Sequence, residues 1–144
     1  MRVISGKYKG KNLLGFDIIG TRPTMDRVKA SVMASIQNYI KDSVVLDLFA
    51  GSGSYGFEAL SRGAASAVFV DKSHDAYNSI KENAKNLGCE NVELVFSDSL
   101  AFLSENHCKF SIIFVDPPYK LDVYEKEPVE KESPLWDLEN LLML

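Results

Sequence analysis

The stretch Val44–Leu60, VVLDLFAGSGSYGFEAL, decides the fold that we expect for this chain. It opens with an apolar run around a single acid, which is typical of a parallel strand buried on both faces. Gly51, Gly53 and Gly56 follow, and they allow a tight turn that presents backbone N–H groups at the start of a helix. This order of strand, glycine-rich turn and helix predicts a site for a nucleotide-like cofactor.

The glycine spacing leaves two kinds of cofactor open. The segment from Gly51 to Gly56 matches the dinucleotide fingerprint G-x-G-x-x-G, and an acid, Asp71, follows about 20 residues later. Asp47 argues against a dinucleotide, because a carboxylate inside an apolar strand is costly to bury unless a donor or a cation meets it. S-adenosylmethionine carries an ammonium and a sulfonium group. The segment D-x-F-A-G-x-G also resembles the first motif of the methyltransferases that use this cofactor.

The composition predicts one globular domain. The chain has 144 residues, of which 46% are hydrophobic, enough to form a core. No apolar stretch is long enough to span a membrane and the N-terminus lacks the core of a signal peptide, so we expect a cytoplasmic protein without a membrane partner. Cys89 and Cys108 have no metal-ligand spacing, which favours free thiols and no metal site.

Charge divides the chain into two parts. Residues 1–43 contain eight Lys and Arg against three Asp and Glu, a net charge of +5, whereas residues 44–144 have a net charge of −9. We therefore expect a basic N-terminal extension, formed by a hairpin and a helix, on an acidic cofactor-binding domain. A basic surface suits a polyanion, the alternative being scattered solvated charge.

The N-terminal extension is expected to start with two short strands over residues 2–19. Lys7, Lys9 and Lys11 alternate with other residues there, so their amines would project to one side and contact phosphates. A helix capped by Thr24 is expected to follow. The apolar face of this helix comprises Val28, Val32, Ile36 and Ile40.

Beyond the glycine turn, strand and helix patterns continue to alternate. The expected strands cover residues 67–71, 92–96 and 110–115, and the expected helices cover residues 73–87 and 99–106. This alternation predicts a parallel, right-handed α/β sheet.

Four acids stand at or near the carboxyl ends of the expected strands: Asp47, Asp71, Asp98 and Asp116. The ligand crevice of an open α/β sheet lies outside those ends. A single acid is a common turn residue, but four in register beside a glycine turn indicate a site. We interpret Asp71 as an acceptor for the ribose hydroxyls of the cofactor and Asp98 as an acceptor for its adenine amino group.

The tetrapeptide Asp116-Pro117-Pro118-Tyr119 is the predicted catalytic segment. Two successive prolines hold the backbone extended. The Asp116 carboxylate and the Pro117 carbonyl would then accept hydrogen bonds from an exocyclic amino group, while Tyr119 offers a face on which a base stacks. A simple proline-rich turn is the alternative, which the neighbouring cofactor turn makes less favourable.

From Arg2 to Tyr119 the chain resembles a known family. The motifs are RVISGKYKGK, TRPT, LDLFAGSG, EALSRGA and DPPY. DLFAGSG with DPPY resembles the Rossmann-like methyltransferases that act on exocyclic amino nitrogens. The whole set is similar to one subgroup, the bacterial 16S ribosomal RNA guanine-N2 methyltransferases of the guanine-966 type.

The resemblance implies direct, metal-free transfer of the sulfonium methyl of S-adenosylmethionine to guanine N2. It implies 16S rRNA as the partner, within the assembled small ribosomal subunit. The cofactor-binding residues that it implies are Asp47, Phe49, Gly51, Gly53, Asp71 and Asp98. The basic residues that would then face RNA are Arg2, Lys7, Lys9, Lys11, Arg22 and Arg27.

The end of the chain departs from the family pattern. Family members continue past DPPY with further strands, whereas this chain passes through an acidic stretch and stops in WDLENLLML. We therefore expect an incomplete sheet, with residues 135–144 at most a short helix. The strand at residues 110–115 would then be an exposed apolar edge, prone to self-association.

Other functions stay open from the residues alone. A DNA adenine-N6 methyltransferase or another amino-nitrogen methyltransferase, such as one acting on protein glutamine, would present a similar target group. A truncated chain that binds cofactor or RNA without turnover is the alternative of another class.

Overall fold

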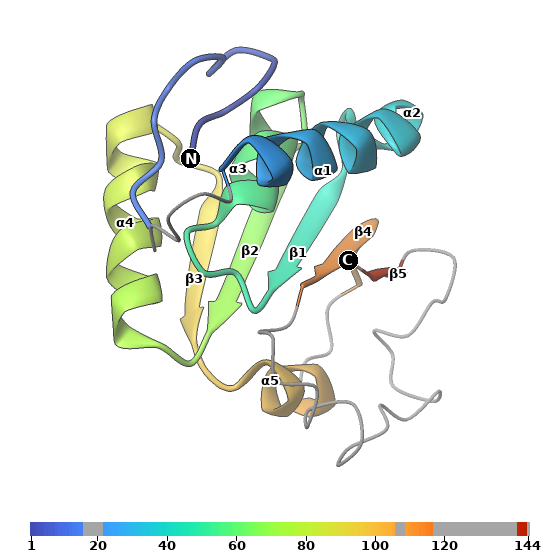
Figure 1. The fold of residues 1–144 in the computed structure, drawn as a ribbon. Helices are drawn as coiled ribbons and strands as arrows, with labels where there is room; N and C mark the ends of the chain where they lie inside the picture. The colour runs from blue at the N-terminus through green and yellow to red at the C-terminus, as the bar shows by residue number, and fades with distance from the viewer. Residues whose placement is uncertain (16–21, 106–108, 117–140, 144) are drawn as a thin grey trace.

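The fold is known from a computed structural model that describes residues 1–15, 22–105, 109–116 and 141–143 (Figure 1). A single parallel sheet forms its centre, in the strand order β3-β2-β1-β4-β5. The strands are β1 (Val44–Leu48), β2 (Ser66–Asp71), β3 (Val92–Phe96), β4 (Ile112–Val115) and β5 (Leu141–Met143). The predicted α/β class and the parallel sheet are confirmed.

Helices connect the first four strands, as parallel pairing requires. The helices are α3 (Ser54–Ser61), α4 (His74–Leu87) and α5 (Ser99–Glu105). The side chain of Ser73 caps α4 by accepting from the Ala76 N–H, and the left-handed Gly88 ends it. α4 and α5 each lie within one residue of the ranges expected for them, 73–87 and 99–106.

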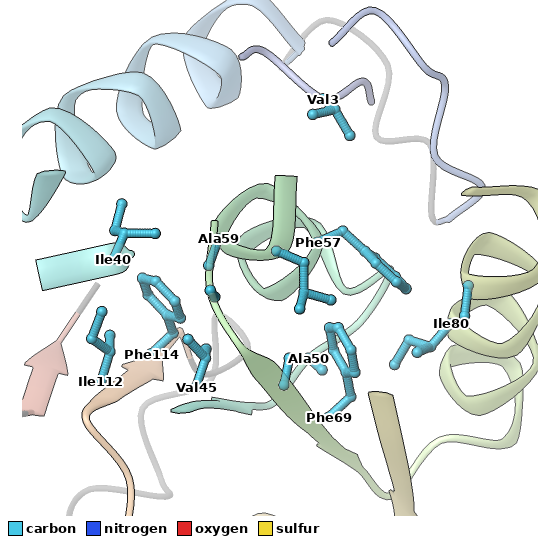
Figure 2. Close-up of a cluster of buried hydrophobic side chains, with 14 of the residues drawn as sticks. Val3, Ile40, Val45, Ala50, Phe57, Ala59, Phe69, Ile80, Ile112 and Phe114 are labelled. Atoms are coloured by element: carbon cyan, nitrogen blue, oxygen red, sulfur yellow. The ribbon is translucent and has the colours of Figure 1, made fainter. Parts of the chain in front are cut away.

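Apolar side chains fill both faces of the sheet. Val45, Phe69 and Phe114 point to the face covered by α3 and α4, where they pack with Phe57 and Ile80 (Figure 2). On the opposite face, alternate strand residues pack against α5, and this second cluster includes Leu46, Leu48, Val70, Leu103 and Ile113. The near-continuous apolar run at β1 is thus explained by burial on both sides.

The expectation of an exposed edge at residues 110–115 is wrong. β5 pairs in parallel with β4, and Ile113, Phe114 and Val115 lie opposite Leu141, Leu142 and Met143. β4 is therefore an interior strand. Because it is apolar on both faces, pairing on both sides suits it better than exposure. The predicted self-association depended on this strand being an exposed edge, and the pairing with β5 removes that reason.

The expected N-terminal hairpin is formed as a short antiparallel pairing without regular strands. The Val3 N–H donates to the Lys11 carbonyl, and the Leu13 N–H donates to the Met1 carbonyl. Residues 1–15, which we call the N-terminal arm, contain one isolated antiparallel bridge, between Arg2 and Asn12. Residues 7–10 form turns, and Gly6 and Gly10 adopt positive φ angles. Lys7, Lys9 and Lys11 are therefore not in a regular strand, and the alternation that would direct their amines to one side is absent.

The segment after the arm differs from the expected helix in two ways. It forms two helices instead of one, and its buried face is not the expected one. α1 (Arg22–Ser35) begins two residues before Thr24, and α2 (Gln37–Ile40) follows it as a separate turn. Val28, expected to face inward, is 48% exposed, while Lys29 is only 3% exposed. A buried carboxylate on α3, Glu58, explains the inward position of Lys29.

Candidate active site

Three of the predicted acids lie on one face of the sheet at its carboxyl edge. Asp47 of β1 is in register with Phe69 of β2 and with Phe114 of β4. Asp71 and Asp116 each follow their strand's phenylalanine by two residues, so all three acids share the face covered by α3. The expected convergence of acids is thus present for these three residues.

Asp47 is a buried acid, and few protein groups are placed to stabilise its negative charge. It is 2% exposed, and the Gly56 N–H donates to its Oδ2 at 3.0 Å. Among the described residues this is its single hydrogen-bond donor, and no cation pairs with it. Burial, the largest cause, and the negative charges of Asp116 and Asp71 raise the pKa of Asp47 well above its usual range. The site suits a ligand that brings positive charge.

Asp71 fastens the glycine turn to the start of α4. Its Oδ2 accepts from the Gly51 N–H at 2.9 Å, and its Oδ1 accepts from the Ser73 N–H at 2.8 Å. Each oxygen retains acceptor capacity, because a carboxylate oxygen has two lone pairs. Asp71 is half-buried, so the carboxylate is both fixed and accessible from the edge of the sheet.

The glycine turn, residues 50–54, combines a packed side with an open side. A Cβ on Gly53 would lie 2.6 Å from the Phe57 ring, so no side chain fits there. A Cβ on Gly51 would meet no atom within 4 Å, and Gly51 has a φ of 59°. The open side of the turn at Gly51 therefore leaves room for a ligand to approach the backbone closely.

Phe49 precedes the turn in a strained conformation. Its φ of 52° is uncommon for a residue with a side chain. The Phe49 N–H donates to Ser99 Oγ at 3.1 Å, which ties the end of β1 to the start of α5. Its ring is half-buried against the second apolar cluster.

Asp98 has a structural task that the sequence interpretation did not assign. Its Oδ1 accepts from the Leu100 and Ala101 N–H groups, each at 3.0 Å, so Asp98 caps α5. Asp98 is exposed after β3, and Oδ2 is not used by this cap. A contact with the cofactor's adenine stays a prediction.

Asp116 directly follows β4. It is the one residue of the predicted catalytic segment that the structure describes. The residue is exposed overall, while partial burial of its carboxyl raises its pKa. Pro117, Pro118 and Tyr119 lie outside the described residues.

Tyr55 is a site residue that the sequence analysis missed. It is the second residue of α3, and its ring stacks on Phe114 with centroids 5.3 Å apart. Burial, followed by the charges of Asp116 and Asp47, raises the pKa of Tyr55 to about 12. Tyr55 therefore lies near both acids. Its position directly after Gly53-Ser54 was the available signal.

The predicted RNA-facing side chains do not form one strand face. Lys7, Lys9, Lys11 and Arg27 are exposed, and the Lys7 ammonium lies 5.0 Å from the centre of the Tyr8 ring. Arg2 is exposed and lies 3.7 Å from Asp26. The side chain of Arg22 is outside the described part of the structure.

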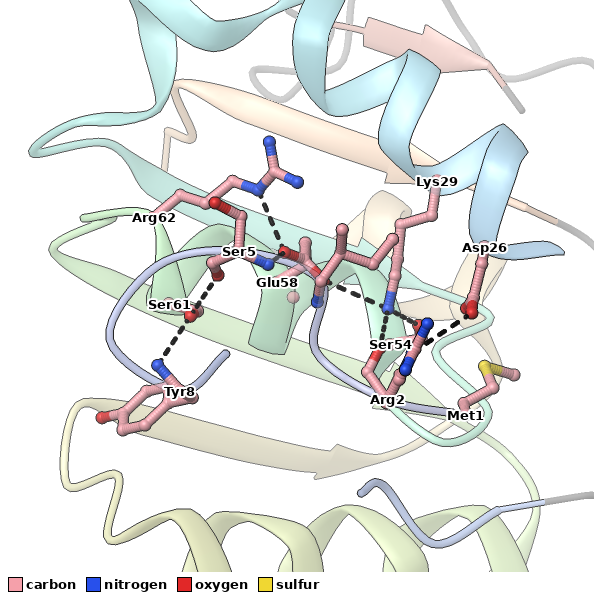
Figure 3. Close-up of polar contacts among 12 residues, drawn as sticks. Met1, Arg2, Ser5, Tyr8, Asp26, Lys29, Ser54, Glu58, Ser61 and Arg62 are labelled. Atoms are coloured by element: carbon pink, nitrogen blue, oxygen red, sulfur yellow. Dashed lines mark hydrogen bonds and ion pairs between the residues drawn. The ribbon is translucent and has the colours of Figure 1, made fainter. Parts of the chain in front are cut away.

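Behind the glycine turn, Glu58 joins the arm, α1 and α3 (Figure 3). Its Oε1 accepts from the Ile4 N–H at 2.8 Å and lies 3.2 Å from Lys29 Nζ. Its Oε2 accepts from the Ser5 N–H and from Arg62 Nε, each at 3.0 Å. Burial lowers the pKa of Lys29, and Glu58 opposes that shift. No charge pattern in the sequence indicated this buried cluster.

Among the described residues, no three His, Cys, Asp or Glu side chains are grouped as metal ligands. Within them, too, no helix has the length and apolarity that crossing a membrane requires.

A parallel sheet in this order, with a glycine turn after β1 and acids at the carboxyl edge, defines the class of protein. It is the Rossmann-like fold of the class I methyltransferases. Residues 1–133 match a family model described as "Conserved hypothetical protein 95", and the chain belongs to this family.

Named relatives are similar over most of the chain. One is the ribosomal RNA small subunit methyltransferase D of Haemophilus influenzae, which is 39% identical over 130 residues, 88% of this chain and 67% of that protein. The putative rRNA methyltransferase YlbH of Bacillus subtilis is 42% identical over 124 residues, 83% of this chain and 67% of that protein.

A solved structure is also similar to this chain in sequence and fold. The putative methyltransferase yhhF from Escherichia coli is 36% identical, with a TM-score of 0.77, over 87% of this chain and 68% of that one. The chain thus spans about two thirds of the length of these relatives.

Proposed function

We propose that this protein transfers the methyl group of S-adenosylmethionine to the exocyclic N2 of a guanine in 16S rRNA. The observation that carries the proposal is the arrangement of Asp47, Asp71 and Asp116 on one face of the sheet, beside the open side of the glycine turn. The names of the relatives support ribosomal RNA as the substrate. The choice of guanine N2 rests on the motif resemblance.

The cofactor would lie across the carboxyl ends of β1, β2 and β3. S-adenosylmethionine, when bound, supplies an electrophilic methyl group on a sulfonium. Asp47 has the unmatched negative charge that a cationic ligand needs, Asp71 keeps acceptors for ribose hydroxyls, and Asp98 keeps one oxygen for the adenine amino group. The open side at Gly51 would let the backbone approach the ligand closely, Gly53 would allow the tight turn that this approach needs, and Phe49 would border the ligand.

Asp116 would hold the guanine amino group in line with the methyl group. Its carboxylate accepts an N–H, which keeps the nitrogen lone pair directed at the methyl carbon and stabilises positive charge that develops on nitrogen. The C–N bond would form as the C–S bond breaks, with S-adenosylhomocysteine as the leaving group, and the proton that nitrogen then loses would pass to solvent. Pro117, Pro118 and Tyr119 are proposed from the sequence to complete the acceptor array and to stack on the flipped base.

The RNA would be held by basic side chains of the arm and of α1, of which Arg22 is proposed from the sequence alone and the others are exposed. These are Arg2, Lys7, Lys9, Lys11, Arg22 and Arg27. Phosphate contacts of this kind position a nucleic acid without reading its sequence. The natural substrate is then 16S rRNA within the small ribosomal subunit.

Methyl incorporation tests the proposal. Small subunits that lack the modification are incubated with the protein and S-adenosyl-[methyl-³H]methionine, and the labelled nucleotide is mapped. We expect label in N2-methylguanosine at one position. Label in N6-methyladenosine would replace the proposed target, and binding of both ligands without incorporation would support a non-catalytic role.

A further inference from the structure

Two residues of the glycine turn accept hydrogen bonds from side chains that also donate hydrogen bonds to the N-terminal arm. Ser52 and Ser54 flank Gly53, which has a left-handed conformation. The Ser52 carbonyl accepts from Asn83 Nδ2 at 3.0 Å, and Ser54 Oγ accepts from Lys29 Nζ at 2.8 Å. Each of these donors makes a second bond, and in both cases its acceptor is a backbone carbonyl of the arm.

Asn83 of α4 forms the first bridge. Its carboxamide is 1% exposed and pairs with both backbone groups of Leu14, since Oδ1 accepts from the Leu14 N–H at 2.7 Å and Nδ2 donates to the Leu14 carbonyl at 2.8 Å. The same Nδ2 donates to Ser52. One side chain thus joins the end of the arm to the glycine turn.

Lys29 of α1 forms the second bridge. Its Nζ donates to the Arg2 carbonyl at 2.9 Å and to Ser54 Oγ, beside its ion pair with Glu58 (Figure 3). This group too is buried. The arm and the turn are therefore joined near both ends of the arm.

Direct packing supports the same connection. Ser52 is only 5% exposed, and its Oγ donates to the sulfur of Met1 at 3.9 Å. A Cβ added to Gly15 would lie 2.4 Å from Ser52 Cβ. Neither the arm nor the turn can shift here without moving the other.

We propose that the arm and the glycine turn act as one coupled unit, in which RNA bound to the arm strengthens cofactor binding at the turn, with Asn83 as the positioning residue. The inference rests on the proposed function. Phosphate contacts to the exposed lysines of the arm favour its docked position, and the docked arm fixes Ser52 and Ser54. The cofactor then meets a turn that is already ordered, and the effect is reciprocal.

The test measures the coupling itself rather than turnover. Equilibrium dialysis gives the Kd of tritiated S-adenosylhomocysteine, which cannot react, for the full chain with and without saturating small ribosomal subunits that lack the modification. The ratio of the two Kd values is the coupling factor, and we expect at least about fivefold tighter binding with RNA. A change that merely destabilises the protein alters both Kd values alike and leaves this ratio unchanged.

The decisive variant is Asn83→Leu, which removes the first bridge at similar volume. It should bind each ligand alone but have a coupling factor near one. Ser61→Ala is the matched control, because Ser61 bonds to Ser5 and Tyr8 of the arm but touches neither Ser52 nor Ser54. This control should keep the coupling.

A second pair of variants, with substitutions in the arm, tests the same coupling if Asn83→Leu does not fold. Gly15→Ala forces a contact with Ser52 and should reduce the coupling factor, whereas Gly10→Asn, where added atoms meet open space, should not. A wild-type factor of one with both ligands bound, or an unchanged factor in both Asn83→Leu and Gly15→Ala, would overturn the inference. A wild-type chain that binds neither ligand overturns the proposed function together with it.

Discussion

Tyr55 stacks on Phe114, and the pair joins the start of α3 to the centre of β4 beside Asp47 and Asp116. The negative charges of Asp116 and Asp47 act on the Tyr55 hydroxyl and contribute to its raised pKa. The helix that follows the glycine turn is thereby in direct contact with the strand that precedes Asp116. This contact makes Tyr55 a reporter for the site.

Tyr55 should stay un-ionised in strongly alkaline solution. Its folded pKa of about 12 exceeds the ordinary 10.0, so the stability that it contributes is complete below pH 10 and is lost as pH rises toward 12. Ultraviolet absorption of phenolate should show the difference between the wild type and Tyr55→Phe titrating near pH 12. A difference that titrates near pH 10 would contradict the described surroundings of Tyr55.

Asp116→Ala should abolish most turnover while leaving the cofactor in place. Loss of one positioned hydrogen-bond partner for developing charge lowers turnover by about 10² to 10³-fold. The Kd of S-adenosylhomocysteine should change little. Asp98→Ala, on the proposed cofactor side, should show the opposite pattern. Equal losses of affinity and turnover in Asp116→Ala would place this carboxylate on the cofactor side.

Asp47→Asn should make the ligand-free protein more stable at neutral pH and a poorer cofactor binder. The raised folded pKa of Asp47 means that its stabilising contribution, complete below 3.8, is lost as pH rises through the folded value. The asparagine oxygen still accepts from Gly56 and carries no buried charge. Urea melts at pH 5 and pH 8 should show an advantage of the variant that grows with pH.

Glu58→Gln should destabilise the fold strongly. Lys29 would remain buried without its counter-charge, and breaking a buried ion pair in this way costs about 3–5 kcal/mol. Urea unfolding measures the loss. Asn91→Ala is the comparison, because it removes one exposed hydrogen bond, from Asn91 Nδ2 to the Ala65 carbonyl, at a cost of about 1 kcal/mol. Similar losses in both variants would show that the Glu58 cluster contributes little.

Replacing Lys7, Lys9 and Lys11 together by Ala should weaken the salt dependence of RNA binding. Each lost phosphate contact reduces the slope of log K against log salt concentration by about 0.7 to 0.9. The methylated nucleotide should not change, because phosphate contacts carry little sequence information. The control is Lys41, Lys81 and Lys85 to Ala, equal in charge and also exposed. Equal slopes in the two triple variants would show that the arm is an ordinary solvated surface.

The sequence was most informative where structure is local. The strands from β1 to β4 are short apolar runs ended by glycine, proline or acidic residues, so their type and order could be predicted. The acids Asp47, Asp71 and Asp116 could be predicted as neighbours because the carboxyl ends of parallel strands share one edge.

The features that depend on distant residues were missed. β5 is only Leu141–Met143, and its partner lies 28 residues earlier, so nothing in its own sequence specifies that pairing. Lys29, Glu58 and Asn83 look like surface residues of amphipathic helices. They are buried because each meets partners more than 24 residues away in the chain, and this information is absent from a local pattern.

The contact between Leu14 and Asn83 also sets an order of events during synthesis. The two residues are 69 positions apart, so the arm leaves the ribosome well before its main anchor has been made. At about 5–20 residues per second this delay lasts roughly 3–14 s. Glu58, the other anchor, appears 54 residues after Ile4. The arm therefore reaches its final position only after α3 and α4 have been made, and its basic side chains stay available to other polyanions until then.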